Sequence, residues 1–135
     1  MEIRVDRLPK TSIIIPTRNR QSSLQEALLS LSGLKYCRDR CEIIVVDDDS
    51  HDGTENAVMT MTPLLPYAVR YFGLKERKDV AGARNVGIQV ADGDILVFTD
   101  DDCLFPEDWL SLLVAPFDSP RVGVVGGPDV APEDS

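Results

Sequence analysis

The sequence predicts an α/β fold in which a mainly parallel sheet carries helices on both faces. Short β-branched, apolar runs alternate along the chain with segments of helical periodicity, an order typical of parallel sheets. The runs are apolar at nearly every position rather than at every second one, as expected for strands that are covered on both faces. We expect a single domain over residues 1–135, with a flexible tail at 128–135.

Five segments have the composition of strands. The first is a β-branched run that ends in a proline, and the second is almost continuously apolar. The five predicted strands are Thr11–Pro16, Cys41–Val46, Tyr67–Phe72, Asp94–Thr99 and Arg121–Val125.

Four helices are expected between these strands. The first begins at a capping box formed by Ser23 and Glu26, has apolar residues at helical spacing, and ends at Gly33. The others are a weaker helix that Asp52 caps and Pro63 terminates, a helix over 79–91, and a short helix over 107–114.

The composition excludes several classes of protein. Fourteen basic and 23 acidic side chains give a net charge of −9, which disfavours nucleic acid as a partner. The apolar runs are only about four residues long, against roughly 20 for a transmembrane helix, and no basic-then-apolar leader opens the chain. Three cysteines at no disulfide-rich spacing indicate a reducing compartment. We therefore expect a cytoplasmic location, which includes the inner face of a membrane.

Two acidic triads follow predicted strands. Asp47–Asp49 comes after the second strand and Asp100–Asp102 after the fourth, while Pro16–Asn19 follows the first. Loops at the carboxyl ends of parallel strands meet at one edge of the sheet, where ligands of such folds bind. Six carboxylates in one place repel one another unless a cation offsets the charge. Carboxylate oxygens suit Mg²⁺ or Mn²⁺, so the sequence predicts a divalent cation at this edge.

Basic residues accompany these acids. Arg18, Arg20 and Arg84 bring positive charge close to the same loops. A guanidinium group suits a phosphate or a stacked base. The helix that starts at Asp79 opens with small residues, which lets a ligand or a strand approach it closely.

Four motifs, in order, resemble the family 2 glycosyltransferases of the GT-A fold. They are Ser12–Asn19, Glu42–Thr54, Gly82–Ile88 and Gly93–Asp102, the last followed by Pro106 and Trp109. Together they lie within residues 11–127. The resemblance implies metal-assisted transfer of a sugar from a nucleotide-diphosphate sugar, most simply a UDP-sugar, to an unknown acceptor, with inversion at the anomeric carbon.

The resemblance also assigns the site residues. It implies that Asp48 accepts a hydrogen bond from the base of the nucleotide and that Asp47 supports Asp48. It also implies that Arg84 lies against the nucleotide and that Asp102 binds the metal on the diphosphate. Asp100 would reach the ribose, and sequence alone does not decide which of the acids binds the metal. The implied nucleotide-sugar-binding residues are Pro16, Thr17, Arg18, Asn19, Asp47, Asp48, Arg84, Asp100 and Asp101, and the implied metal ligands are Asp102 and Asp100.

The family's catalytic domain continues beyond the point at which this sequence stops. We therefore expect the chain to be the donor-binding part of a longer domain, with the general base beyond residue 135; Asp129 is the one candidate within the sequence. A non-catalytic nucleotide-binding or assembly module, such as a homodimer, is an alternative. A magnesium-dependent phosphoryl-transfer protein is another, although the first strand is followed by Pro16–Asn19 and not by an Asp-x-Asp motif.

Overall fold

The computed structural model describes residues 8–127 of the chain. Four strands and four α-helices alternate along this part, with short 3₁₀ turns at Arg38–Arg40, Thr62–Leu64 and Ala115–Asp118. In chain order the elements are β1 (Thr11–Thr17), α1 (Gln21–Leu31), β2 (Cys41–Asp48), α2 (Thr54–Met61), β3 (Ala68–Leu74), α3 (Asp79–Val90), β4 (Ile95–Phe98) and α4 (Trp109–Val114).

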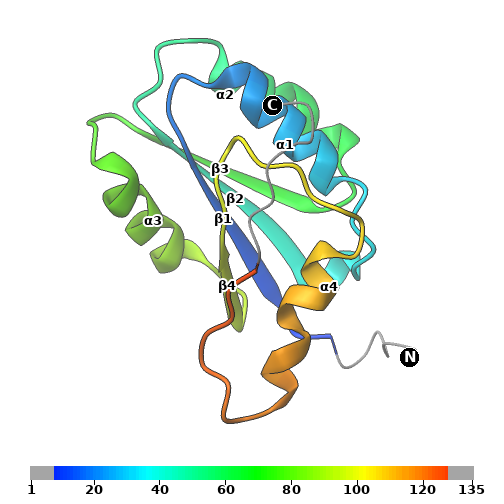
Figure 1. Cartoon of the computed structure of the whole chain (residues 1–135). Coiled ribbons are helices and arrows are strands. Elements are labelled where there is room, and N and C mark those ends of the chain that lie inside the picture. The colour runs from blue at the N-terminus through cyan, green and yellow to red at the C-terminus, as the bar shows by residue number, and fades with distance from the viewer. Residues whose placement is uncertain (1–7, 128–135) are drawn as a thin grey trace, which may run out of the picture.

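The four strands form one parallel sheet in the order β3-β2-β1-β4 (Figure 1). The pairing of β1 with β2 runs from Thr11 opposite Cys41 to Thr17 opposite Asp47. Every residue of β1 and β2 is buried, whereas β3 and β4 at the edges are partly exposed. This difference explains why the two central strands are the most continuously apolar segments of the sequence.

Helices cover both faces of the sheet, as predicted. Successive side chains of a strand point to opposite faces. Ile13 and Ile15 of β1 therefore pack in a cluster with residues of α1 and α4, while Ile14 packs against α3. Figure 1 shows α3 on one side of the sheet and α1 and α2 on the other.

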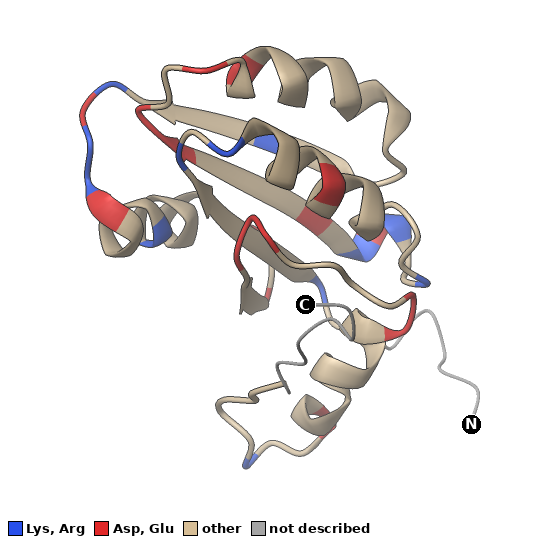
Figure 2. Ribbon diagram, turned by 45° about the horizontal axis from the view of Figure 1, so that its top comes forward, with Lys and Arg blue, Asp and Glu red and all other residues tan. Residues whose placement is uncertain are grey.

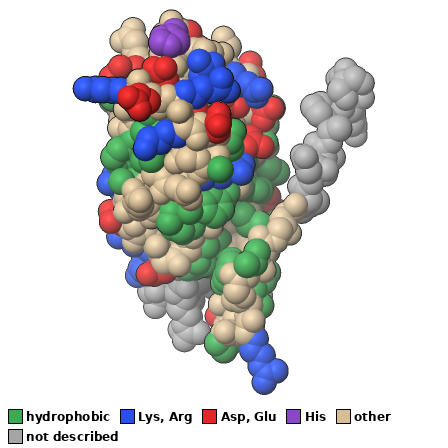
Figure 3. All heavy atoms as spheres, turned by 90° about the vertical axis from the view of Figure 1, so that its left-hand side faces the viewer, with side chains coloured by type: hydrophobic (Ala, Val, Ile, Leu, Met, Phe, Trp, Pro, Cys, Tyr) green, Lys and Arg blue, Asp and Glu red, His purple; other side chains and the backbone are tan. Residues whose placement is uncertain are grey.

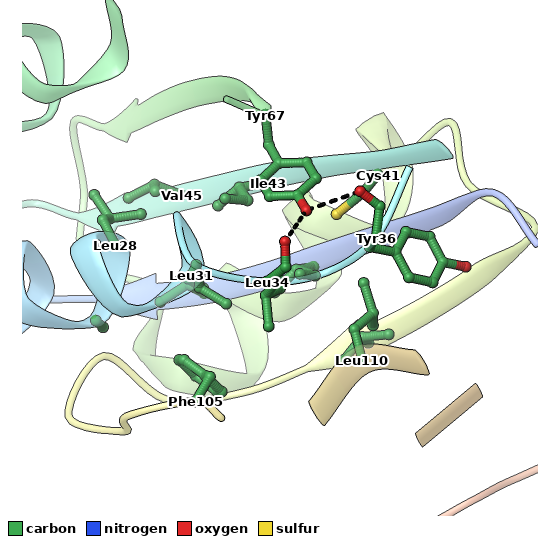
Figure 4. Close-up of a cluster of buried hydrophobic side chains, with 14 of the residues drawn as sticks. Leu28, Leu31, Leu34, Tyr36, Cys41, Ile43, Val45, Tyr67, Phe105 and Leu110 are labelled. Atoms are coloured by element: carbon green, nitrogen blue, oxygen red, sulfur yellow. Dashed lines mark hydrogen bonds between the residues drawn. The ribbon is translucent and has the colours of Figure 1, made fainter. Parts of the chain in front are cut away.

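The larger of the two hydrophobic clusters contains a buried tyrosine whose hydrogen bonds join the start of β3 to the segment between α1 and β2. Figure 4 shows Tyr67, just before β3, with its hydroxyl directed at the backbone that links α1 to β2. This hydroxyl donates to the carbonyl oxygens of Leu34 and Tyr36, at 2.7 and 3.0 Å respectively. A tyrosine is favoured here because its ring fills the apolar cluster while its polar end satisfies buried carbonyl groups.

The first helix begins earlier than the sequence predicts. It starts at Gln21, so Ser23 lies inside the helix, and the predicted capping box of Ser23 and Glu26 is wrong. The backbone amide of Gln21 donates instead to Oδ2 of Asp52, 3.2 Å away. Oδ1 of Asp52 accepts from the amide of Thr54, at the start of α2. One carboxylate in the loop between β2 and α2 therefore satisfies amides at the first turns of two helices.

The predicted fifth strand is also wrong. Arg121–Val125 forms no strand, and within residues 8–127 nothing pairs with the outer edge of β4. The side chain of Val124 is 90% exposed. An apolar run becomes a strand only where a neighbouring strand supplies its hydrogen bonds, and none does so here. The expected tail at 128–135, including Asp129, lies outside the described residues.

Candidate functional site

A cleft of about 490 Å³ opens at the carboxyl edge of the sheet. The chain leaves β1 towards β2 on one side and later returns to β4 on the other, so the direction of the connections reverses beside β1. Open parallel sheets bind their ligands at such reversal points. In Figure 3, charged side chains of both signs gather at one end of the molecule, above a band of hydrophobic ones.

Most of the predicted site residues line this cleft. Asn19, Asp47 and Arg84 do not line it, although each lies in or contacts a loop that does. The lining residues are Pro16, Thr17, Arg18, Arg20, Asp48, Arg77, Asp79, Val80, Ala83, Asp100, Asp101 and Asp102. The structure therefore brings the loops after β1, β2 and β4 together, as the parallel topology predicts.

Three side chains in the loop after β4 form a cluster with metal-ligating chemistry. One ligand atom each from Asp100, Asp102 and Cys103 lies within 4.8 Å of the other two. Figure 2 shows this acidic loop directly after β4. The two carboxylates are exposed, so they are available to a cation from solution. Hard oxygen donors of this kind suit Mg²⁺ or Mn²⁺. The predicted metal ligands Asp100 and Asp102 thus lie together.

The middle acid of the triad points inward instead. Asp101 is only 5% exposed, and its Oδ2 accepts from the hydroxyl of Thr17 at 2.8 Å. Nη1 of Arg20 lies 3.4 Å from the other carboxylate oxygen. Burial raises the pKa of Asp101, and the contacts with Thr17 and Arg20 offset only part of that effect. Asp101 therefore ties the loop after β4 to the end of β1.

Arginines approach the acidic cluster from two elements. Arg20, just before α1, lies 3.5 Å from Oδ2 of Asp102, and Arg84 of α3 lies 3.4 Å from Oδ1 of Asp100. The Nε atoms of Arg18 and Arg84 are buried and have no hydrogen-bond partner among the described residues. A buried N–H group without a partner is an available donor for a bound anion.

The two acids at the end of β2 are both buried, but they have different surroundings. The carboxylate of Asp47 accepts from the Tyr71 hydroxyl at 2.5 Å and from the Ser50 amide at 3.0 Å. Burial and the negative charge of Asp47 raise the pKa of Tyr71. Asp48 accepts from the amide of Lys78 at 2.6 Å and lines the cleft. Asp47 is thus held by the protein on both oxygens, while Asp48 is the acid that a ligand can reach.

Asn19 links the loop after β1 to the loop after β2. Its backbone amide donates to the hydroxyl of Ser50 at 2.9 Å, and its side-chain oxygen accepts from the amide of His51 at 2.7 Å. The left-handed backbone of Asn19, with φ of 52°, allows both contacts. Asn19 therefore holds two rim loops in a fixed relation to each other.

Backbone strain is concentrated around the cleft. Among residues 8–127, the only non-glycine residues with positive φ are Asn19, Asp49 and Asp79, at 52°, 60° and 65°. They lie in the loop after β1, in the loop after β2 and at the first residue of α3. Such conformations cost free energy and tend to occur at functional sites. Asparagine and aspartate tolerate them better than other side chains do.

Sequence reasoning missed Arg77 in the loop after β3, although it singled out the helix that follows, which starts at Asp79. Arg77 and Asp79 line the cleft, with Arg77 Nε 3.5 Å from Asp79 Oδ1. Figure 2 shows acidic and basic residues interleaved in this loop, which leads into α3. The predicted parallel topology could have indicated this loop, because it also follows the carboxyl end of a parallel strand.

The sequence matches a known family over most of its length: Glycosyl transferase family 2, over residues 12–135. Glycosyltransferase AglE of Haloferax volcanii is 32% identical over 125 aligned residues, in a match that covers 89% of this chain and 39% of AglE. Dolichol-phosphate mannosyltransferase of Pyrococcus furiosus is 33% identical over 109 aligned residues, in a match that covers 78% of this chain and 29% of that protein.

Solved structures give the same result. Mannosyltransferase PcManGT from Pyrobaculum calidifontis, in complex with GDP-Man and Mn²⁺, matches with a TM-score of 0.82 and 35% identity over 85% of this chain and 34% of its own. S. aureus TarS 1-349, in complex with UDP-GlcNAc, matches with a TM-score of 0.73 and 28% identity over 81% of this chain and 31% of its own.

The chain belongs to glycosyl transferase family 2, and its fold is of the GT-A type that the motifs indicated. It spans between 29% and 39% of the length of these relatives. Within residues 8–127, no helix combines the length and apolar composition that crossing a bilayer requires.

Proposed function

We propose that the chain forms the donor-binding part of a glycosyltransferase and binds a nucleotide-diphosphate sugar together with a divalent cation. One observation carries this proposal: Arg18, Asp48 and the Asp100–Asp102 loop come from three different strand ends and meet in one cleft at the reversal point of the sheet. A cleft of about 490 Å³ is also within the range of small-molecule sites.

The nucleotide end of the donor would meet Asp48 and the arginines. A carboxylate that lines the cleft can accept a hydrogen bond from a ring N–H of the base, which is the role we assign to Asp48. The unpartnered Nε groups of Arg18 and Arg84 can donate to the ribose or to the diphosphate. The negative charge of the diphosphate favours these cationic partners.

The cation would be held by Asp100 and Asp102, whose carboxylates are exposed and close together. A bound Mn²⁺ or Mg²⁺ stabilises the negative charge that develops on a departing diphosphate. Asp101 contributes indirectly, because its contact with Thr17 fixes the loop that carries the two ligands. Cys103 adds a thiol beside Asp102, with its Sγ 3.9 Å from Oδ1 of that residue.

Family membership supports a proposal for the donor and for the transfer step. We propose a UDP-sugar as the first donor to test and GDP-mannose as the second, because solved relatives hold UDP-GlcNAc and GDP-Man. We further propose transfer to the acceptor with inversion, in one displacement. A general base must lie within hydrogen-bond reach of the acceptor hydroxyl, and we assign none among residues 8–127.

Thermal melting with UDP-GlcNAc and with GDP-mannose, each with and without Mn²⁺, tests the proposal. A ligand that binds only the folded state raises the melting midpoint. Asp102→Asn should abolish the Mn²⁺-dependent part of the shift, whereas Asp118→Asn, at an exposed position in the turn after α4, should keep it. The absence of a shift with either sugar nucleotide at millimolar concentration would contradict the proposal.

A second measurement separates an enzyme from a binding module. A module that only binds the nucleotide gives the same melting shift and no turnover. Slow, Mn²⁺-dependent hydrolysis of the sugar nucleotide, lost in Asp102→Asn, would show that the site activates the sugar–phosphate bond.

A further inference from the structure

A single nitrogen of Arg20 contacts two acids in the loop after β4. Its Nη1 lies 3.4 Å from Oδ1 of Asp101 and 3.5 Å from Oδ2 of Asp102. The side chain of Asp101 is 7% exposed and also accepts from Thr17, whereas that of Asp102 is 55% exposed. Arg20 therefore has one buried partner with a fixed position and one exposed partner that solvent and ions can reach.

Asp102 is at the same time part of the proposed cation site, in the cluster with Asp100 and Cys103. A divalent cation at this cluster would lie close to the guanidinium group of Arg20. Two positive charges a few ångströms apart repel each other, and less so where water screens them. The guanidinium group and the cation therefore compete for the same carboxylate.

The backbone around Arg20 is firmly held, so only its side chain needs to move. Its carbonyl oxygen accepts from the amide of Leu24 at 3.0 Å, and the next amide, of Gln21, donates to Asp52. The side chain of Arg20 is itself 57% exposed, which leaves room for the guanidinium group to withdraw from Asp102.

We propose that Arg20 is a positioning residue that neutralises Asp102 before a cation arrives and releases it when the cation binds, while staying in contact with Asp101. This inference rests on the proposed cation site, and it adds a built-in competitor to that site. The competitor holds the acidic loop in place when no cation is bound, and it lowers the affinity for the free cation.

Binding of Mn²⁺ alone, followed through the electron paramagnetic resonance signal of the free ion, tests this inference without any turnover. Arg20→Gln removes the competing charge, and Arg20→Lys keeps it. Arg77→Gln is the matched control: Arg77 lines the same cleft with a side chain 59% exposed, but its acidic partner is Asp79 and not a member of the cluster. Circular dichroism and melting confirm that each variant is folded.

We expect Arg20→Gln to bind Mn²⁺ about three- to fivefold more tightly than the wild type, as an exposed ion pair would allow. Arg77→Gln should change the affinity less than about twofold, because it frees no cluster carboxylate and salt screens its charge. Arg20→Lys should stay close to the wild type.

The inference would be overturned if Arg20→Gln bound Mn²⁺ with the same affinity as Arg77→Gln, or more weakly than the wild type. Either result would leave the proposed cation site intact. If neither the wild type nor Arg20→Gln binds Mn²⁺ at millimolar concentration, the proposed cation site fails, and this inference fails with it. Binding by Arg20→Gln alone would support the inference.

Discussion

Gly87 of α3 packs directly on Ile14 of β1. A Cβ atom built at position 87 would lie 2.4 Å from Cγ2 of Ile14, which is far too close for any real contact. The side chain of Ile14 is completely buried under α3, so it has little space to move away. Because α3 also carries Arg84, this contact fixes how closely the helix brings that side chain to the acidic loop.

Gly87→Ala should therefore destabilise the protein although alanine is the better helix former. Overpacking costs about 1–3 kcal/mol, and the gain in helix propensity of about 1 kcal/mol offsets part of it. Because the approach of 2.4 Å is so close, we expect a cost in the upper part of this range and a net loss of up to about 2 kcal/mol in urea unfolding. Gly33→Ala is the control, since its nearest neighbour would be 3.6 Å away. A Gly87→Ala variant as stable as Gly33→Ala would contradict the observed packing.

Glu42 of β2 is a buried carboxylate that joins several elements. Its Oε2 accepts from the hydroxyl of Ser12 at 2.6 Å and from the amide of Asp92 at 2.7 Å, and its Oε1 accepts from Arg70 at 3.1 Å. Glu42→Gln replaces one acceptor with a donor facing Arg70. We expect a loss of about 2–3 kcal/mol at neutral pH. Glu107→Gln, in an exposed pair with Lys35, should change stability by less than about 0.5 kcal/mol.

The acid sensitivity of the protein should depend on the same residue. Burial alone would raise the pKa of Glu42, but hydrogen bonds from Ser12, Asp92 and Arg70 lower it overall. A pKa that is lower in the folded state means that ionised Glu42 stabilises the fold above about pH 4.3, the ordinary value for glutamate. This stabilisation is lost as the pH falls through the folded-state pKa. Between neutral and acid pH, the stability of Glu42→Gln should decline less steeply than that of the wild type.

The central part of the fold could be predicted because its signals are local. The continuous apolar runs that begin at Thr11 and Cys41 are sufficient to identify strands covered on both faces. The start of α1 could not be predicted in this way. The acceptor for its first turn is Asp52, 31 positions further along the chain than Gln21, and no local pattern reveals such a contact. The false strand at 121–125 has the same cause, because pairing with another strand is a tertiary property.

The loops that form the site could be predicted from the sequence, but the directions of their side chains could not. The rule that parallel strand ends converge identified the loops that carry Arg18, Asp48 and Asp102. The direction of Asp101 was beyond sequence reasoning, because side-chain alternation ends where β4 ends and a turn begins. In the structure, Asp101 accepts a hydrogen bond from Thr17 and so holds the loop after β4 against the end of β1.

The pair formed by Tyr71 and Asp47 tests how much one hydrogen bond to a carboxylate contributes to the free energy of unfolding. Tyr71→Phe removes the donor at 2.5 Å from a carboxylate that is 4% exposed. Tyr36→Phe removes a bond to the neutral carbonyl oxygen of Pro9 and serves as the comparison. Bonds to charged groups contribute about 1.5–3 kcal/mol and neutral ones about 0.5–1.5 kcal/mol. Urea unfolding should therefore show the larger loss for Tyr71→Phe, and the reverse order would contradict a stronger bond between Tyr71 and Asp47.

The bond between Thr17 and Asp101 should determine the order of the acidic loop. Thr17→Val keeps the shape of the side chain but removes the hydroxyl that lies 2.8 Å from Oδ2 of Asp101. The buried carboxylate then loses a donor, at a cost of about 1–3 kcal/mol. Arg20 remains as a partner, so the loop should loosen locally rather than unfold the domain.

Amide hydrogen exchange separates these two effects of Thr17→Val. We expect faster exchange in the segment 99–103, with little change in the buried central strand β2, because loops open at lower free energy than core strands. Thr60→Val is the control, since among residues 8–127 its hydroxyl bonds only to the carbonyl oxygen of Asn56, one turn back in α2. Uniformly faster exchange throughout the sheet would mean that the Thr17 hydroxyl supports global stability and not the local position of the loop. Unchanged exchange at 99–103 would mean that Asp101 is held without it.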